Sequence, residues 1–263
     1  MANVAVVAAR HGARIALAGG AGQDAWGDWL RDRLEDEDVD LRWFTLVEGA
    51  PTPMALVTID DAGEPSYQIY GDGIATVAHA LKSGVSAAVK ESDALFFASN
   101  TLVGEAERQV TMEARELALE LERPVIFDPN LRLHRWPSRA EAAASANACV
   151  PGALLVRANL PEAALMTGEA DPERAASAIL KAGARLVVIT LGADGAILRG
   201  ELDRDVPGPE VKVVSTVGAG DVLTGVLLAR LANTGFYPPA VAASLPEAVE
   251  EAGRACERWG ALE

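Results

Sequence analysis

The residues best suited to chemistry lie in the segment 215–221, which reads Ser-Thr-Val-Gly-Ala-Gly-Asp and runs directly into a predicted apolar helix. Because Gly218, Ala219 and Gly220 carry no large side chains, their backbone N–H groups can approach a ligand closely. The helix N-terminus adds unpaired donors and a partial positive charge, which suits a phosphate group. Asp221 would lie beside that anion, where it can take a proton from an attacking hydroxyl. The segment therefore offers what phosphoryl transfer to an alcohol requires.

The same segment also has a structural interpretation. Small residues before a helix are common where chains pack closely, and an Asp in the first turn is a routine partner of the helix dipole. The segment alone leaves both interpretations open.

A second polar cluster follows a predicted strand at 124–127, where the chain reads Phe-Asp-Pro-Asn-Leu-Arg from 127 to 132. Asp128 can hold Mg²⁺ through water, and Asn130 and Arg132 can contact substrate or phosphate. In the alternative interpretation, Asp128 and Asn130 bond to nearby backbone in an Asx-type turn. The residues favour neither interpretation over the other.

Two further motifs each follow a strand. Asn159 can cap the next helix and Glu162 can complete a capping box, and the same spacing lets both side chains face phosphates and organise Mg²⁺ through its waters. Thr190 can offer a hydroxyl to a nucleotide phosphate, while Gly192 and Gly195 allow the backbone to approach the nucleotide. This last Gly-x-x-Gly pattern is equally typical of a hairpin turn.

Composition restricts the class of protein. The 263 residues are half hydrophobic and carry a net charge of −15, which argues against a nucleic-acid or anionic-membrane surface. Cys149 and Cys256 form no disulfide framework and are expected to be core or half-buried residues in a reducing compartment. No metal-ligand spacing involves the histidines, and His134 is expected at the surface. With no bilayer-spanning run and no signal-peptide pattern, we expect a soluble cytoplasmic protein.

Strand and helix patterns alternate over most of the chain. Outside 43–70, strands are expected at 14–18, 94–98, 124–127, 154–157 and 186–190. Helices are expected at 24–34, 105–122, 138–149, 161–167, 172–181, after Gly220, and at 247–259. In the first of them Trp26, Trp29, Leu30 and Leu34 would form the apolar stripe. This alternation predicts a parallel α/β sheet covered on both faces, with the motifs just beyond the strands where ligands bind.

The pattern changes between residues 43 and 70. Strands are expected at 43–47, 53–59 and 65–70, and the sequence Asp60-Asp61-Ala62-Gly63 between the last two predicts a hairpin turn. No helix separates these strands. We therefore expect a small sheet standing away from the main body, as a lid would.

These motifs occur in the order and spacing of the ribokinase-like (PfkB) carbohydrate kinase family, which the chain resembles from Asn3 to about residue 255. The segment 215–221 resembles the family signature D-T-x-G-A-G-D, and 18–27 resembles its G-x-D-x-x-G region. The resemblance implies a doubly wound, mostly parallel sheet with helices on both faces and a small, partial β lid. One kinase domain would span 1–263, with the lid at about 43–72.

The resemblance also implies roles for the residues. Asp221 would deprotonate the sugar hydroxyl, and the backbone of 218–220 would form the anion hole. The nucleotide side would use Asn159 and Glu162 for Mg²⁺ and phosphates, with Thr190, Gly192 and Gly195 at the nucleotide. Asn3 matches a sugar-contacting Asn, and Asp128, Asn130 and Arg132 lie in a string similar to that of the fructokinase and 2-keto-3-deoxygluconate kinase branches.

The chain departs from the family pattern in two places. It is expected to lack about 30 N-terminal residues, including the first strand, part of the lid and the Gly-Gly before Asn3, a loss that would expose unpaired sheet edges. Ser215 stands where the signature has its first Asp, a position that helps form a monovalent-cation site in relatives. The resemblance therefore does not carry K⁺ activation over to this chain.

Two functions follow from these observations. The first is an ATP- and Mg²⁺-dependent kinase for a hydroxyl of a small sugar or sugar acid, with the lid as a possible homodimer surface. The alternative is a degenerate family member that binds sugar or nucleotide without transferring phosphate. The departure at the N-terminus motivates the alternative, whereas the presence of Asp221, Asn159 and Glu162 favours the kinase.

Overall fold

The backbone of this protein divides into two compact units. The computed structural model describes residues 1–59, 65–70, 82 and 84–262. The first unit comprises Met1–Ala88, Pro209–Phe236 and Pro246–Glu263. The second comprises Val89–Gly208 and Tyr237–Leu245. Each unit has its own sheets and helices.

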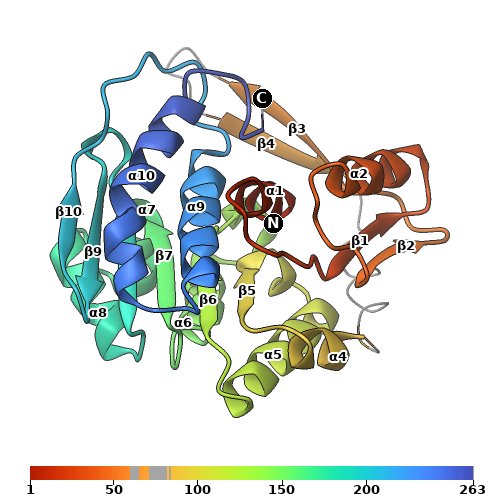
Figure 1. Cartoon of the computed structure of the whole chain (residues 1–263), viewed down its shortest axis with the longest axis horizontal. Coiled ribbons are helices and arrows are strands. Elements are labelled where there is room, and N and C mark those ends of the chain that lie inside the picture. Colours follow the sequence, from red (N-terminus) through yellow and green to blue (C-terminus); the bar gives the residue numbers. More distant parts are fainter. Residues whose placement is uncertain (60–64, 71–81, 83, 263) are drawn as a thin grey trace. The chain divides into compact units, whose positions relative to one another are not determined.

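A six-stranded sheet forms the second unit, with the strands in the order β10-β9-β8-β7-β6-β5 (Figure 1). The strands are β5 (Leu95–Ala98), β6 (Val125–Asp128), β7 (Leu155–Asn159), β8 (Leu186–Thr190), β9 (Ala196–Gly200) and β10 (Arg204–Val206). Strands β5 to β8 are parallel, whereas β9 and β10 are each antiparallel to their neighbours. Three of the parallel strands, β6, β7 and β8, end in the polar residues Asp128, Asn159 and Thr190, and this edge of the sheet carries the motifs.

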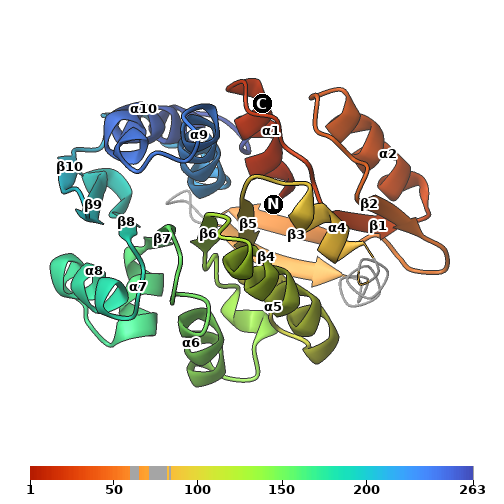
Figure 2. The same ribbon diagram turned by 60° about the horizontal axis from the view of Figure 1, so that its bottom comes forward.

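Helices α5 (Glu105–Glu120), α6 (Arg139–Asn147), α7 (Leu160–Thr167) and α8 (Pro172–Lys181) connect the parallel strands. Helix α4 (Val85–Lys90) precedes β5 and begins in the first unit. Figure 2 shows α5 to α8 along one side of the strands. Side-chain caps fix where three of them begin: the side chains of Ser138, Asn159 and Asp171 accept hydrogen bonds from the first turns of α6, α7 and α8.

In its described residues, the first unit combines helices with two small sheets. The elements are α1 (Ala2–Arg10), β1 (Gly19–Gly22), α2 (Ala25–Glu35), β2 (Phe44–Val47), β3 (Met54–Ile59), β4 (Pro65–Tyr70) and α9 (Ala219–Asn233), with α10 (Pro239–Ala255) from Pro246 onward. Strand β1 pairs in parallel with β2, and β3 pairs antiparallel with β4. The β3–β4 hairpin confirms the strands predicted there, while its turn, Asp60–Gly63, lies outside the described residues, as do residues 71 and 72 of the proposed lid.

Helices α1 and α9 pack closely within the first unit. A Cβ on Gly225 would lie 2.6 Å from both Cβ and Cγ1 of Val7 and 3.1 Å from the carbonyl oxygen of Val4, so no side chain fits at position 225 without movement. At the other end of the pair, Asn233 Nδ2 donates to the carbonyl oxygen of His11 at 3.2 Å. The two helices therefore run in the same direction and touch along most of α1.

Most predicted elements are confirmed, usually to within two residues. The exceptions have physical reasons. The expected strand at 14–18 is wrong: Ala16 makes one isolated bridge with Asp40, and the ladder begins only at Gly19. Helix α10 begins eight residues before the predicted 247, because Pro246 lies inside it rather than ahead of it. Helices α1 and α4 and strands β9 and β10 were not predicted.

The expected apolar stripe of α2 is wrong in its first half. Leu34 is buried, but Trp26 and Trp29 are 58% and 60% exposed. The prediction that these two indoles are buried rested on their hydrophobicity alone. In the first unit, the buried residues of this helix are Gly27 and Leu34 instead.

Both cysteines are free, as expected, with Cys149 buried and Cys256 half-buried. Burial raises the pKa of the Cys149 thiol to about 11. Among the residues described (1–59, 65–70, 82 and 84–262), no helix has the length and hydrophobicity needed to cross a membrane.

The tight contact at Gly225 predicts the effect of adding one methyl group. Gly225→Ala gains about 0.5–1 kcal/mol of helix propensity, but overpacking against Val7 typically costs about 1–3 kcal/mol. We expect a net loss in the free energy of unfolding, measured by urea denaturation. A variant as stable as the parent chain would show that α1 and α9 separate at no cost, which would contradict the packing described here.

Candidate active site

Helix α9 begins at a position that only glycine can occupy without strain. Gly218 is its N-cap and has φ +86°, in the left-handed region. A Cβ on Gly218 would also lie 2.4 Å from the Cβ of Ala261 and 2.9 Å from its backbone. Both conformation and space therefore require glycine at this position.

The backbone N–H groups at the start of α9 fall into two sets, those with an acceptor in the chain nearby and those with none inside the helix. The first intrahelical bond runs from the Val222 N–H to the carbonyl oxygen of Gly218 at 2.9 Å, and the Ala219 N–H donates to the carbonyl oxygen of Thr216 at 3.3 Å. The N–H groups of Gly220 and Asp221 come before that first intrahelical bond, so neither has an acceptor inside the helix. No side chain caps this N-terminus. These two N–H groups, more than that of Ala219, are the ones positioned for an anion.

Asn3 and Asp221 are brought together. Asn3 Nδ2 donates to Asp221 Oδ2 at 2.8 Å, across 218 residues of sequence and in a half-buried setting. Both residues lie in the first turns of their helices, α1 and α9, which run side by side in the same direction. The contact holds the carboxylate of Asp221 at the N-terminus of α9.

Ser215 precedes this helix in a fully buried position. Its Oγ accepts from the Val217 N–H at 3.1 Å, and its own N–H donates to the carbonyl oxygen of Cys256 at 3.1 Å. The hydroxyl thus shapes the turn that leads to Gly218.

In the second unit, an arginine joins two of the predicted site residues. Arg157 Nη1 donates to Asp128 Oδ2 at 3.3 Å and Nη2 donates to Thr190 Oγ1 at 3.1 Å. These residues come from β6, β7 and β8, three neighbouring parallel strands. Asp128 and Arg157 are both buried, at 2% and 7% exposure. Sequence reasoning missed Arg157, although a guanidinium inside the otherwise apolar strand Leu155–Asn159 was a readable signal.

Asn159 and Glu162 form the predicted capping box at the start of α7. Asn159 Oδ1 accepts from the Glu162 N–H at 2.8 Å, and Glu162 Oε2 accepts from the Asn159 N–H at 3.0 Å. Glu162 Oε1 accepts a third hydrogen bond, at 2.7 Å, from the Leu131 N–H in the loop after β6. This buried carboxylate therefore ties the Asp-Pro-Asn-Leu-Arg loop to the next helix.

The buried surroundings at this edge of the sheet shift the pKa of the Glu162 carboxyl group. Burial and the nearby negative charge of Asp128 raise the pKa of Glu162, while Arg157 and the backbone N–H groups of Asn159 and Leu131 oppose that rise. Two carboxylates and one guanidinium therefore share a buried space. Such clustering of perturbed groups at strand ends is typical of functional sites.

The remaining loop residues are less enclosed. Asn130 has a positive φ of +40° and is half-buried, as is Arg132. His134 is exposed, which confirms it as a surface residue. The left-handed backbone at Asn130 turns the chain shortly after the buried Asp128.

Gly192 and Gly195 lie in the turn between β8 and β9, which confirms the hairpin interpretation of this segment. A Cβ on Gly192 (φ +64°) would meet nothing within 4 Å, so its backbone faces open space. A Cβ on Gly195 would lie 2.0 Å from the carbonyl oxygen of Val206. Gly195 is therefore required by the packing of its own chain, and Gly192 is the residue with room for a ligand.

The G-x-D-x-x-G segment consists of Gly22, Asp24 and Gly27, and it is organised around Thr52. Asp24 accepts from the Thr52 N–H at 2.9 Å and from Thr52 Oγ1 at 2.7 Å, and it caps α2 by accepting from the Gly27 N–H at 2.9 Å. A Cβ on Gly22 would lie 2.0 Å from the carbonyl oxygen of Ala50. The motif is thus a tight junction between β1, α2 and the segment before β3.

The comparisons with known proteins agree with this geometry. Residues 1–256 match the pfkB family carbohydrate kinase domain. The chain belongs to the pfkB family of carbohydrate kinases. Family membership confirms the resemblance that the motifs carried, and it makes the chain a carbohydrate kinase by class.

Individual relatives extend this result. The chain is 30% identical over 235 residues to fructokinase-2 of Solanum habrochaites, covering 88% of this chain and 71% of the relative. It is 28% identical, with a TM-score of 0.87, to a fructokinase from Vibrio cholerae O395 solved with fructose, ADP and a calcium ion, covering 99% and 85% of the two chains. It is 25% identical, with a TM-score of 0.84, to aminoimidazole riboside kinase from Salmonella enterica, solved with aminoimidazole riboside and an ATP analogue, covering 99% and 86%. The predicted ribokinase-like α/β fold is confirmed.

The hydrogen bonds of Asp24 predict that the stability of this pfkB kinase depends on pH. Hydrogen bonds from the backbone and hydroxyl of Thr52 and from the Gly27 N–H lower the pKa of Asp24 to about 2. A carboxylate with a depressed folded-state pKa stabilises the fold above its unfolded pKa, and that stability is lost as the pH falls through the folded value. We expect Asp24→Asn to lower the Tm at pH 7, with the difference from the parent shrinking between about pH 4 and pH 2.

The matched control is Asp28→Asn, which alters an exposed carboxylate in the same helix. It should leave the Tm at pH 7 nearly unchanged. Equal Tm losses in the two variants would contradict the junction as the cause. Differential scanning calorimetry over the pH series makes both measurements.

Proposed function

We propose that this chain transfers the γ-phosphate of ATP to a hydroxyl of a small sugar or sugar acid, with Asp221 as the general base. By its family, the chain is an ATP-dependent carbohydrate kinase that acts with a divalent metal ion; the proposal concerns which residues perform the reaction. The observation that carries it is the 2.8 Å hydrogen bond from Asn3 Nδ2 to Asp221 Oδ2. With Oδ2 held by an amide, Oδ1 is oriented to accept the proton of the sugar hydroxyl.

The start of α9 supports the anion-hole part of the proposal. The left-handed backbone at Gly218 leads the chain into α9, and no side chain caps the first N–H groups of this helix. The N–H groups of Gly220 and Asp221, with Gly218 and Ala219 shaping the turn, would hold the charge of the transferring phosphoryl group. The base and the anion hole then belong to one helical turn.

The oxygen-rich edge of the second unit fits a divalent metal ion and phosphates. Asp128, Asn159 and Glu162 offer carboxylate and amide oxygens, the donors that Mg²⁺ prefers. Bound Mg²⁺ neutralises phosphate charge during the transfer. Glu162 already accepts two backbone N–H bonds, so we assign it and Asn159 to the waters of the ion. Arg157 holds Asp128 and Thr190 in place and adds positive charge at this edge.

The remaining assignments follow the open backbone. Thr190 and Gly192 would contact the nucleotide, because Gly192 faces open space, whereas Gly195 supports the turn from behind. Asn130 and Arg132 would contact the sugar or its phosphate, as would the carbonyl oxygen of the Asn3 amide. Since the fructokinase relatives act on fructose by name and one holds fructose, we propose fructose as the first substrate to test.

The assignment of the base predicts the effect of one substitution. Asp221→Asn keeps an oxygen for Asn3 but cannot take a proton, so kcat should fall by about 10²- to 10⁴-fold while the Tm stays unchanged. ADP release with Mg-ATP is measured against fructose, ribose, 2-keto-3-deoxygluconate and a nucleoside.

Asp32→Asn, at an exposed carboxylate on α2, serves as the control and should keep full activity. Undiminished turnover by Asp221→Asn would exclude Asp221 as the base. If the parent chain bound nucleotide but released no ADP with any sugar, the phosphoryl-transfer proposal itself would fail.

The proposed lid includes the β3–β4 hairpin, one face of which is apolar and exposed. Met54 pairs with Tyr70 in the ladder and Leu56 lies two residues along the same face, and these side chains are 46%, 50% and 56% exposed. An exposed apolar face on a two-stranded sheet supports pairing with a second copy of the chain. We expect a dimer by light scattering and a monomer for Leu56→Asp; a parent chain that is monomeric at high concentration would contradict this.

A further inference from the structure

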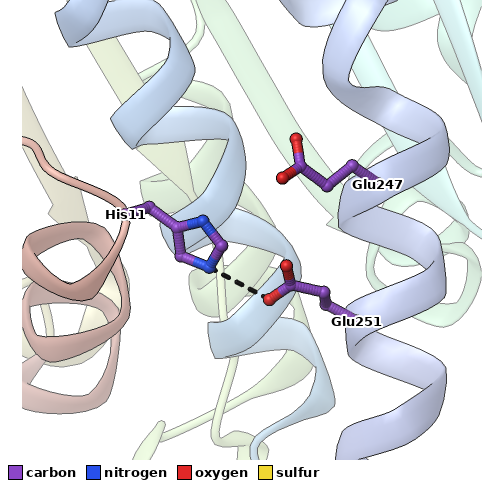
Figure 3. Close-up of side chains that lie close together, drawn as sticks. All are labelled: His11, Glu247 and Glu251. Atoms are coloured by element: carbon purple, nitrogen blue, oxygen red, sulfur yellow. Dashed lines mark hydrogen bonds and ion pairs between the residues drawn. The ribbon is translucent and has the colours of Figure 1, made fainter.

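Three potential metal ligands converge at the end of α1 that is opposite to Asn3. His11 is the C-cap of α1, and Glu247 and Glu251 lie one turn apart on α10. One donor atom from each side chain lies within 4.8 Å of the other two, and the side chains point toward one another in Figure 3. His11 Nε2 and Glu251 Oε2 are already 3.0 Å apart. All three residues belong to the first unit.

The arrangement is held from behind by α9. Asn233 Nδ2 donates to the backbone carbonyl oxygen of His11 at 3.2 Å, which fixes the residue that carries the imidazole. Arg230, one turn earlier on α9, donates from Nε to Glu247 Oε2 at 3.0 Å and from Nη2 to Oε1. One helix thus orients ligands from two others. Supporting contacts of this kind are what distinguish a built metal site from a chance gathering of side chains.

We infer that His11, Glu247 and Glu251 form a binding site for a divalent transition-metal ion of the zinc class. One imidazole nitrogen and two carboxylate oxygens are the three-ligand donor set that such ions accept, with water completing the coordination. Metal–ligand bonds of about 2.0–2.2 Å place tetrahedral donors about 3.3 Å apart. The 3.0 Å between His11 Nε2 and Glu251 Oε2 is close to that spacing, and the donor atom of Glu247 lies within 4.8 Å of both.

The charges of the cluster are compatible with a cation. The two carboxylates and the guanidinium of Arg230 together leave a net charge of −1 around the imidazole. Arg230 engages both oxygens of Glu247, but an ionised carboxylate has about four lone-pair sites and the fork of the guanidinium uses two. A metal ion would take the place of the hydrogen atom between His11 Nε2 and Glu251, and the imidazole would then carry its one N–H at Nδ1.

Within the first unit, this site is separate from the anion site proposed at the start of α9. Asp221 and Asn233 lie twelve residues apart on α9, which corresponds to about 18 Å along the helix at 1.5 Å per residue. An imidazole ligand also selects against Mg²⁺, which prefers oxygen donors and retains its waters. A bound ion would connect the end of α1 to α10 and stabilise the first unit without taking part in phosphoryl transfer.

The test uses the full chain without an affinity tag, treated with EDTA and then freed of chelator, in the absence of nucleotide. Isothermal titration with ZnCl₂ should show one ion bound per chain, and CoCl₂ should give the visible absorption of a low-symmetry site. A hundredfold excess of metal over the Kd should raise the Tm by about 5 °C. MgCl₂ at the same concentrations should do neither.

Variants decide whether these residues are the ligands. His11→Gln and Glu251→Gln should each weaken Zn²⁺ binding at least about tenfold, whereas Glu250→Gln, which alters a neighbouring exposed carboxylate paired with Arg254, should not. The Tm in EDTA and the far-UV circular dichroism of each variant establish that it is folded. The inference is overturned if the parent chain binds no Zn²⁺ below about 100 µM, if Mg²⁺ binds equally well, or if binding survives unchanged in both ligand variants.

Discussion

The close packing of α1 on α9 is the constraint on which the first unit depends. With no side chain at Gly225, the two helices approach until Val7 and Val4 touch the backbone of α9. Helices packed that closely have little freedom to slide along each other, because the side chains at their interface interdigitate. One end of this contact holds Asn3 against Asp221, and the other holds His11 near Glu251. A single glycine therefore positions side chains at both ends of the pair.

The second unit contains a cluster of buried charges in addition to its apolar core. Asp128, Arg157 and Glu162 are each buried, and removing such groups from water costs several kcal/mol per ion before their attraction is counted. A buried ion cluster is weak evidence for stability, because apolar side chains of the same size would often serve as well. Its position at the ends of three parallel strands is instead where α/β sheets bind ligands. The charges are therefore better explained by the reaction than by the fold.

The sequence predicted what local rules control and missed what tertiary contacts control. The parallel strands, the capping box at Asn159 and the glycine-rich start of α9 follow from short patterns, and all three are found. Helix α1 was missed because its run of Val and Ala has no polar face to give a helical period, since it is buried against α9. Trp26 and Trp29 were placed inside on hydrophobicity, although in the first unit they are exposed. Arg157 was overlooked because its partners, Asp128 and Thr190, are distant in sequence.

The two helix N-termini near the predicted motifs differ in a way that supports the roles proposed for them. Helix α7 begins with a complete capping box, in which Asn159 and Glu162 satisfy each other's backbone N–H groups. Its first turn is thus occupied by its own side chains, and an anion there would have to displace them. Helix α9 begins at a glycine with no side-chain cap, so its first N–H groups are left to a ligand. Helix dipole and sequence pattern alone treat both ends as anion sites. The capping geometry favours α9 for the transferring phosphoryl group and leaves Asn159 and Glu162 to the metal ion and its waters.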